Sequence, residues 1–398
     1  MKLPRTALLP SIIVAIASGI GCGFFFPEWL TRLFTTFASL FASLLDFVIP
    51  LLIVGYVAPA IAEIGRGAAK MLVATAVLAY VFTIGSGLLS YGVSVMTFPA
   101  ILDMGSEATT ATEAATGAAT GAYDVAPYFT IALEPIMTVM AALVLAFILG
   151  LGASRLPGNV MLTWLNEFRD IITMAIRGVI IPLLPPFIFA IFLKMSVTGE
   201  VAPVLSTFVK IIAVIFALHI ALLVVQYTIA WLFSGRNPFS SLAKMLPAYF
   251  TALGTQSSAA TIPVTLSRTI AMGVNKDVAG FVIPLCATIH LSGSTLKIVA
   301  CAMAIMMTGG MEYDFGMMAG FIAMLGITMI AAPGVPGGAI MASLGLLSSM
   351  LGFGEANIAM MIALYIAMDS FGTACNITGD GAIAQIIERI FARKGTKS

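Results

Sequence analysis

The chain has 398 residues, of which 60% are hydrophobic and only 9% are charged, and its formal net charge is +1. A soluble domain carries about 25% charged residues, so this composition excludes an ordinary soluble protein. The near-zero charge provides no basic surface, so we expect no nucleic-acid partner. All the cysteines lie in apolar segments, which argues against a disulfide framework. The composition predicts an all-α polytopic membrane protein.

Apolar stretches of about 20 residues or more are long enough to cross a bilayer. The sequence predicts such spans at 7–27, 34–62, 69–98, 128–152, 162–196 and 202–234. The first run is long enough to span and lacks a small-residue cleavage site before a polar domain, so we interpret it as a span and not a signal peptide.

Lysines and arginines flank the predicted spans unevenly. They occur before the first span, between the second and third, after the fourth and sixth, and at the end of the chain, whereas residues 103–127 contain none. The positive-inside rule therefore predicts that both termini are cytoplasmic, which implies an even number of crossings. We interpret the membrane as a bacterial inner (plasma) membrane. The Ala/Thr/Gly-rich segment 103–127 is then an extracytoplasmic loop, to which we assign no chemistry.

The pattern changes after residue 235. Segment 240–273 is interrupted by GTQSSAATIPVT, and segment 316–350 is interrupted by AAPGVPGG. Proline removes a backbone donor and glycine loosens a helix, so both segments are expected to break within the membrane. Each is followed by a long helix with a polar centre, at 277–308 and 355–391. This repetition is typical of an inverted repeat with a binding site at the midplane; the alternative is two proline-kinked structural spans.

The last predicted helix carries an unusual polar stripe. At about 100° per residue, Asp369, Thr373, Asn376 and Asp380 share one helix face. A carboxylate at bilayer depth costs at least a few kcal/mol, so each should face protein or water and hold a positive group. We interpret the stripe as the floor of a binding site. For Asp369 the alternative is a structural ion pair or helix contact.

Three motifs carry a resemblance that extends over essentially the whole chain: SSAATIPVT at 257–265, GVPG at 334–337, and the run from Asp369 to Asp380. Together, and in this order, they resemble the glutamate-transporter family, the dicarboxylate/amino acid:cation symporters. The resemblance implies eight transmembrane helices, two re-entrant helical hairpins, a homotrimer and an elevator-type transport mechanism.

The resemblance also implies a division of the chain into a static scaffold and a moving transport domain. Residues 1–68 (spans 1 and 2) and 99–198 (the extracytoplasmic loop with spans 4 and 5) would belong to the scaffold. Residues 69–98 (span 3) and 199–398 (span 6, both hairpins, and spans 7 and 8) would move, with the second hairpin as the gate.

By position in the family motifs, Asp369 would hold the substrate ammonium and Asn376 the α-carboxylate. The full substrate-binding set implied by the resemblance is Ser257, Ser258, Gly334, Val335, Asp369, Gly372, Thr373 and Asn376. A zwitterion needs one buried acceptor and several donors, which agrees with these residue types. Acidic-substrate members of the family carry an arginine at one of two positions; this chain has Gly372 at the first and Gln256 at the second. A second carboxylate would lack a bidentate partner, so we predict a neutral amino acid as the substrate.

The ion sites depart further from the family pattern. The seventh span reads HLSGS (290–294) where the family has NMDGT, and on the third span the expected polar trio is Thr75, Leu78 and Ala79. Cys286 and His290 form an i,i+4 pair, and thiolate, imidazole and carboxylate are transition-metal ligands. We predict a divalent metal of the zinc or nickel type as coupling cation, with the ligand set Cys286, His290, Asn376 and Asp380. Alternatives are a proton carried by His290, residual sodium, or uncoupled transport.

Two other classes of function remain open at this point. An intramembrane metalloenzyme would use Cys286 and His290 as nucleophile and base, or as a catalytic metal site, and a channel would show flux without saturation. We expect a transporter and no enzyme, since an enzyme gives the paired broken segments no obvious purpose. We expect structural roles for the isolated polar residues: His219 as a packed core histidine, and Lys297 as a lysine that snorkels or is paired internally.

Overall fold

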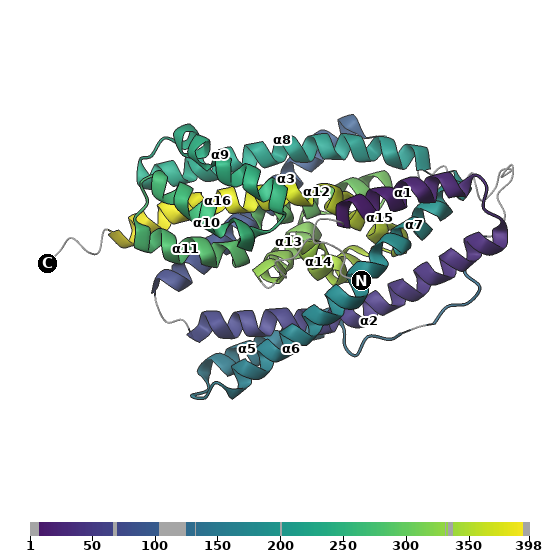
Figure 1. Cartoon of the computed structure of the whole chain (residues 1–398), viewed down its shortest axis with the longest axis horizontal. Coiled ribbons are helices and arrows are strands. Elements are labelled where there is room, and N and C mark those ends of the chain that lie inside the picture. Colours follow the sequence, from purple (N-terminus) through teal and green to yellow (C-terminus); the bar gives the residue numbers. More distant parts are fainter. Residues whose placement is uncertain are drawn as a thin grey trace.

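The computed structural model of the chain describes residues 8–66, 70–102, 125–131, 133–199, 201–330, 332 and 337–392. Within these ranges the regular structure is helical (Figure 1). The N-terminal elements are α1 (Leu8–Gly23), α2 (Glu28–Arg66), α3 (Lys70–Ile101), α5 (Val139–Arg155), α6 (Val160–Ala175), the π-helical turn η1 (Ile176–Ile180), α7 (Ile181–Thr198) and α8 (Val201–Ser234). The C-terminal elements are α9 (Pro238–Thr255), α10 (Ser258–Ala271), α11 (Lys276–Ile289), α12 (Ser292–Thr308), α13 (Phe315–Ile330), α14 (Gly338–Leu351), α15 (Glu355–Ala367) and α16 (Asp369–Ala392).

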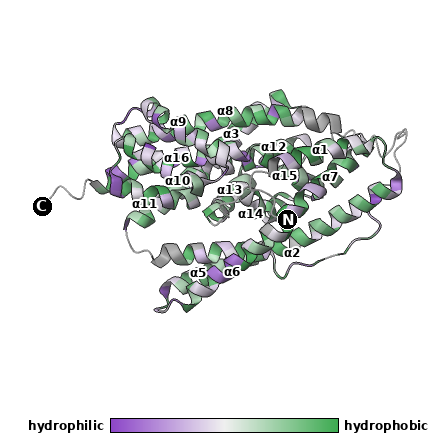
Figure 2. Ribbon diagram, viewed as in Figure 1, coloured by the Kyte–Doolittle hydropathy of each residue, from purple (hydrophilic) through white to green (hydrophobic). Residues whose placement is uncertain are grey.

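Several of these helices have the length and composition of membrane spans. Among the described residues, 5 stretches qualify, and a sixth is formed by α15 and α16 if that bent pair is one span. Hydrophobic residues predominate along most of the helices (Figure 2), and large ones are exposed: Val209, Ile220 and Leu232 of α8 are each at least two-thirds exposed. Such a surface suits lipid, so the chain is an integral membrane protein. The predicted total of eight spans is not reached by this criterion, because the described parts of α1 and α5 are shorter.

The N-terminal helices pack around α2 and α7, which also pack against each other. α2 packs against α5 and α6 in the lower part of Figure 1, and α1 packs against α7. The fourth predicted span, 128–152, was placed too early, because α5 begins only at Val139. Thr138 caps this helix by accepting a hydrogen bond from Ala141 N at 3.2 Å, and the segment before it, which contains Pro135, is irregular. Residues 103–124 of the predicted loop lie outside the described residues.

The two predicted helix interruptions are confirmed. Between α9 and α10, Gln256 adopts a left-handed conformation (φ 51°), and Ser257 caps α10 by accepting from Ala260 N. α13 ends at Ile330, and α14 begins after Gly337, whose φ of 74° suits glycine. α9 packs against α10, and α13 packs against α14.

The two helices predicted to be continuous, 277–308 and 355–391, are themselves broken. The first divides into α11 and α12 at His290 and Leu291, and the second bends by 61° at Met368. Sequence periodicity missed both breaks because neither contains proline or a glycine pair. Side chains of other helices donate to or accept from backbone groups at each break, at Gly293 in the first and at Tyr365 and Met368 in the second.

Candidate functional site

α16 carries the polar stripe through the interior of the C-terminal half. It packs against α8, α9, α10 and α11, and Figure 1 shows it running through the middle of this group. Asp369, Thr373, Asn376 and Asp380 are all at most 9% exposed. The stripe therefore faces protein, as predicted, and its two carboxylates lie toward opposite ends of the polar region.

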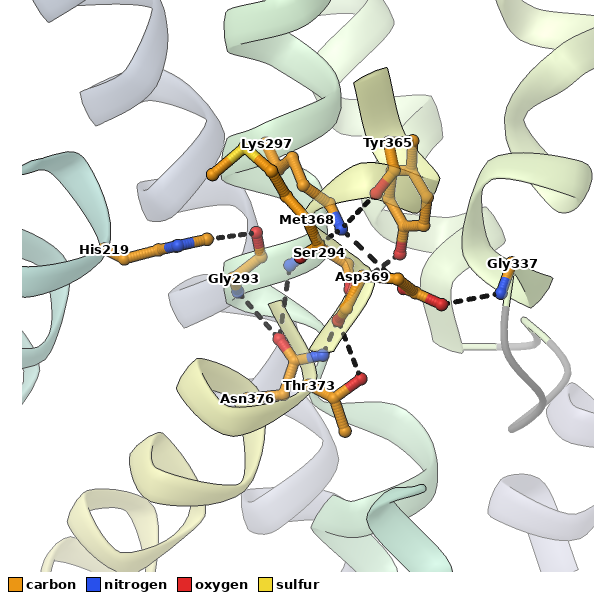
Figure 3. Close-up of polar contacts among 10 residues, drawn as sticks. All are labelled: His219, Gly293, Ser294, Lys297, Gly337, Tyr365, Met368, Asp369, Thr373 and Asn376. Carbon is orange, nitrogen blue, oxygen red and sulfur yellow. Dashed lines mark hydrogen bonds and ion pairs between the residues drawn. The ribbon is translucent and has the colours of Figure 1, made fainter. Parts of the chain in front are cut away.

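Asp369 lies at the bend between α15 and α16 and is 7% exposed (Figure 3). Its Oδ2 accepts a hydrogen bond from the backbone N–H of Gly337 at 2.8 Å. Gly337 is the N-cap residue of α14, where free N–H groups and the helix dipole favour an anion. The carboxylate therefore connects the start of α16 to the start of α14.

Lys297 of α12 lies beside this carboxylate and is fully buried. Its Nζ donates to the carbonyl oxygens of Tyr365 at 3.1 Å and Met368 at 3.2 Å, which lie at the bend (Figure 3). The same ammonium lies 3.7 Å from Asp369 Oδ1 and 3.4 Å from the centroid of the Tyr365 ring. Carbonyl oxygens, a carboxylate and an aromatic face thus surround one positive charge.

Asn376 holds the start of α12. Its Oδ1 accepts hydrogen bonds from the backbone N–H groups of Gly293 at 2.7 Å and Ser294 at 3.3 Å, and its Nδ2 donates to Ser294 Oγ at 3.1 Å (Figure 3). The Tyr365 hydroxyl also donates to Ser294 Oγ. His219 is buried, as expected, and its Nε2 lies 3.1 Å from the Gly293 carbonyl oxygen. This histidine therefore contacts the start of α12, next to the break between α11 and α12.

A second buried pair lies deeper along α16. His290 Nδ1 and Asp380 Oδ1 are 2.8 Å apart, and the two residues are 1% and 0% exposed. His290 Nε2, Asp380 Oδ2 and Gln226 Oε1 are buried and have no hydrogen-bond partner among the described residues. Gln226 Nε2 donates to Ser292 Oγ, which links α8 to the same helix break.

The other predicted substrate residues lie in two places. Thr373 donates its hydroxyl to the Asp369 carbonyl oxygen at 3.1 Å, and Gly372 lies beside Lys297, whose Nζ would be 3.1 Å from a Cβ at that position. Ser257 and Ser258 lie at the start of α10. Gly334 and Val335 lie outside the described residues.

The structure does not support the predicted transition-metal site. Among the described residues, no three His, Cys, Asp or Glu side chains lie close enough together to hold a metal ion. The i,i+4 argument fails because α11 ends at Ile289 and His290 leaves the helical conformation (φ −102°, ψ 102°). Asn376 Oδ1 already accepts two backbone N–H groups, and His290 is paired with Asp380.

Of the two interpretations given for Lys297, internal pairing is correct and snorkelling is wrong, but the sequence did not identify Asp369 as its partner. Polar residues (292–295) precede Lys297 on α12 and an apolar run (298–307) follows it, and a fully buried lysine cannot place its ammonium in water by snorkelling. That position was the available signal, and it called for a partner carboxylate on another helix. Gln226 and Ser292 were missed as partners because they gave no comparable signal.

Broken helices around buried charges, inside an apolar helical protein, are the features of a membrane carrier. The sequence comparisons agree. A family model described as the sodium:dicarboxylate symporter family matches residues 8–390, and the chain belongs to this family. This confirms the resemblance to the glutamate transporters and agrees with the expectation of a transporter and not an enzyme.

Individual relatives are distant. The chain is 26% identical over 397 residues to the serine/threonine transporter SstT of Streptococcus thermophilus, which covers 97% of this chain and 96% of that protein. It is 28% identical over 255 residues to excitatory amino acid transporter 4 of Mus musculus (63% of this chain, 45% of that protein). It is 31% identical over 180 residues to excitatory amino acid transporter 1 of Homo sapiens (45% and 33%). The matched part therefore spans less than half the length of the excitatory amino acid transporters.

Proposed function

We propose that this chain is a secondary active, cation-coupled symporter of a small neutral amino acid. The family membership supports cation-coupled symport, and the relative matched over nearly its whole length is named as a serine/threonine transporter. The observation that carries the proposal is the buried Asp369 at the junction of α15, α16 and the start of α14. A carboxylate in this position can bind a substrate ammonium, and the neighbouring helix start can bind an α-carboxylate.

Residues 372 and 256 support a neutral substrate. Neither carries the arginine that a second carboxylate would need. One observation favours a second candidate, an acidic substrate: Lys297 brings a positive charge close to Gly372. Its ammonium already contacts two carbonyl oxygens and Asp369, so we rank this candidate second.

We propose the proton as the coupling ion, taken up at the pair formed by His290 and Asp380. Histidine is the side chain whose charge ordinarily changes between pH 5 and 8, and here it contacts a carboxylate inside a broken helix. Asp380 Oδ2 and His290 Nε2 have no partner among the residues the structure describes, so both can accept a further proton. Sodium remains the alternative cation because the family is named for it.

For the transport cycle we propose an elevator mechanism in a homotrimer. The scaffold would comprise residues 1–68 and 99–198, and the transport domain would comprise residues 69–98 and 199–398. The α9–α10 and α13–α14 pairs would act as re-entrant hairpins, the latter as the gate. The contact of Asp369 with the N-cap of α14 supports a gate that responds to the substrate site. We place both termini in the cytoplasm and the chain in a bacterial inner membrane.

The test is uptake of radiolabelled serine, alanine or aspartate into proteoliposomes of purified protein. We expect saturable uptake of serine or alanine, driven by an inward proton gradient at constant sodium. His290→Gln should abolish the response to the proton gradient, whereas the matched change His219→Gln should leave it in place. Added zinc or nickel should change nothing.

Three results would overturn parts of this proposal. Uptake that follows a sodium gradient and ignores pH would exclude proton coupling. Preference for aspartate over serine would establish the acidic-substrate candidate. Flux that does not saturate would exclude a carrier.

A further inference from the structure

The surroundings of Lys297 Nζ have the composition of a binding site for a monovalent cation. Two backbone carbonyl oxygens, of Tyr365 and Met368, lie 3.1 and 3.2 Å from the nitrogen. The Asp369 carboxylate and the face of the Tyr365 ring complete the shell. Both carbonyl oxygens lie at the 61° bend, and each also accepts backbone N–H groups: Tyr365 O from Met368, and Met368 O from Phe371 and Gly372.

Charge balance explains why a cation is needed in this place. Asp369 is 7% exposed and cannot stay ionised at this depth without a positive partner. Its Oδ2 accepts a hydrogen bond from the neutral N–H group of Gly337, which adds no positive charge. Within the described part of the chain, Lys297 is the one cationic side chain in an ion pair with Asp369.

We propose that Lys297 is a tethered counter-ion: its ammonium permanently occupies a monovalent-cation site next to the substrate carboxylate Asp369. A carrier without this lysine would need a mobile cation of the sodium, potassium or alkylammonium class in the same place. A zwitterionic substrate then enters a site whose charge is already balanced. The role in transport rests on the proposed function, whereas the cation site itself does not.

A merely structural ion pair would show a different response to substitution. Removing the lysine side chain would destabilise either kind of pair. Only a cation site would then bind an added cation in the space that the side chain vacates. The discriminating measurement is therefore rescue by cations, with a variant that removes the charge and leaves no space as the matched control.

Lys297→Ala opens the site, and Lys297→Met removes the charge with little change in volume. The missing atoms in Lys297→Ala correspond to n-propylammonium. The melting temperature of the detergent-purified variants is measured without substrate in choline, sodium, potassium and n-propylammonium chloride at equal ionic strength. Choline is too large for the site and serves as the reference salt.

We expect the melting temperature of Lys297→Ala to rise saturably by about 3 °C or more in n-propylammonium and in sodium or potassium, relative to choline. The unsubstituted protein, Lys297→Met and the exposed-site control Lys194→Ala should not respond. Equal responses of the Ala and Met variants, or no response of the Ala variant, would overturn the proposal. So would a Lys297→Ala protein that fails to fold even in n-propylammonium.

The same variants separate this inference from the proposed function. In Lys297→Ala, serine binding should become dependent on the rescuing cation, whereas the unsubstituted protein should bind serine equally in choline and in n-propylammonium. If the unsubstituted protein transports no amino acid, the proposed function fails. The melting response in the absence of substrate then still decides whether Lys297 occupies a cation site.

Discussion

The two ends of the polar stripe on α16 neutralise a buried carboxylate in different ways. At Asp369, one oxygen accepts a backbone N–H group and the other lies 3.7 Å from the ammonium of Lys297. At Asp380, one oxygen lies 2.8 Å from His290 and the other has no partner in the described part of the chain. A lysine is an almost permanent cation, whereas a histidine gains and loses its charge near neutral pH. The first end is therefore suited to hold charge constant, and the second to exchange it.

A pair of glycines, seven residues apart on α16, marks the same difference. A Cβ at Gly372 would meet the flexible end of Lys297 at 3.1 Å, which can move by a few tenths of an ångström. A Cβ at Gly379 would meet Gln226 Oε1 at 2.5 Å and His290 Cε1 at 2.8 Å. The Asp380 end is thus packed more tightly against its partners, although it has unpaired polar atoms.

The largest expected effect comes from removing the charge at the Asp369 end. Asp369→Asn leaves the Lys297 ammonium buried without its carboxylate, which should lower the free energy of unfolding by about 3–5 kcal/mol. Binding of serine should weaken by about 100-fold or more, because the substrate ammonium loses its acceptor. Melting temperature and equilibrium binding of radiolabelled serine measure the two effects.

The matched control is Asp277→Asn, since Asp277 is exposed at the start of α11. It should cost less than about 1 kcal/mol and leave serine binding unchanged. Unchanged serine affinity in Asp369→Asn would show that the ammonium binds elsewhere.

An intermediate effect is expected from crowding the Asp380 end. Gly379→Ala forces Gln226 or His290 to move, and overpacking of this kind costs about 1–3 kcal/mol. The same substitution should reduce the response of uptake to a proton gradient, because it changes the distance between His290 and Asp380. Uptake at several external pH values measures this loss.

Two alanine substitutions serve as references for that experiment. Gly280→Ala in α11 meets no atom within 4 Å and should be neutral or stabilising by about 0.5–1 kcal/mol. Gly372→Ala should be tolerated better than Gly379→Ala. The reverse order would contradict the difference in packing between the two ends.

The smallest effect is expected from removing only the hydroxyl of Tyr365, on the aromatic side of the Lys297 site. Tyr365→Phe removes the hydrogen bond to Ser294 Oγ and keeps the ring over the ammonium, so it should cost about 1 kcal/mol. Tyr365→Leu also removes the ring and should cost about a further 1–2 kcal/mol. Melting temperatures of both variants test this; equal losses would mean that the ring contributes nothing to holding the cation.

Local sequence signals predicted the parts of this fold that depend on local chemistry. Long apolar runs predicted the membrane helices, and glycine, proline and small polar residues predicted the breaks around Gln256 and after Ile330. The position of the polar stripe was also predictable, because a carboxylate such as Asp380 has to face the protein interior.

The breaks at His290 and Met368 could not be predicted in the same way, since they depend on side chains from distant helices. Asn376 holds the start of α12, and Lys297 holds the end of α15, across sequence separations of about 70–80 residues. The metal prediction failed for the same reason: it assumed a continuous helix through His290.

The hydrogen bond between Asp369 and Gly337 has a consequence for turnover. A symporter that accumulates its substrate has to return to the outward-facing state without substrate. An unbalanced buried charge in the unloaded protein would oppose this return. Without a bound substrate, Asp369 already has both a backbone donor and an internal cation, so α14, the proposed gate, can close without one. We therefore expect net accumulation, and not obligatory one-for-one exchange, to be the natural mode of this carrier.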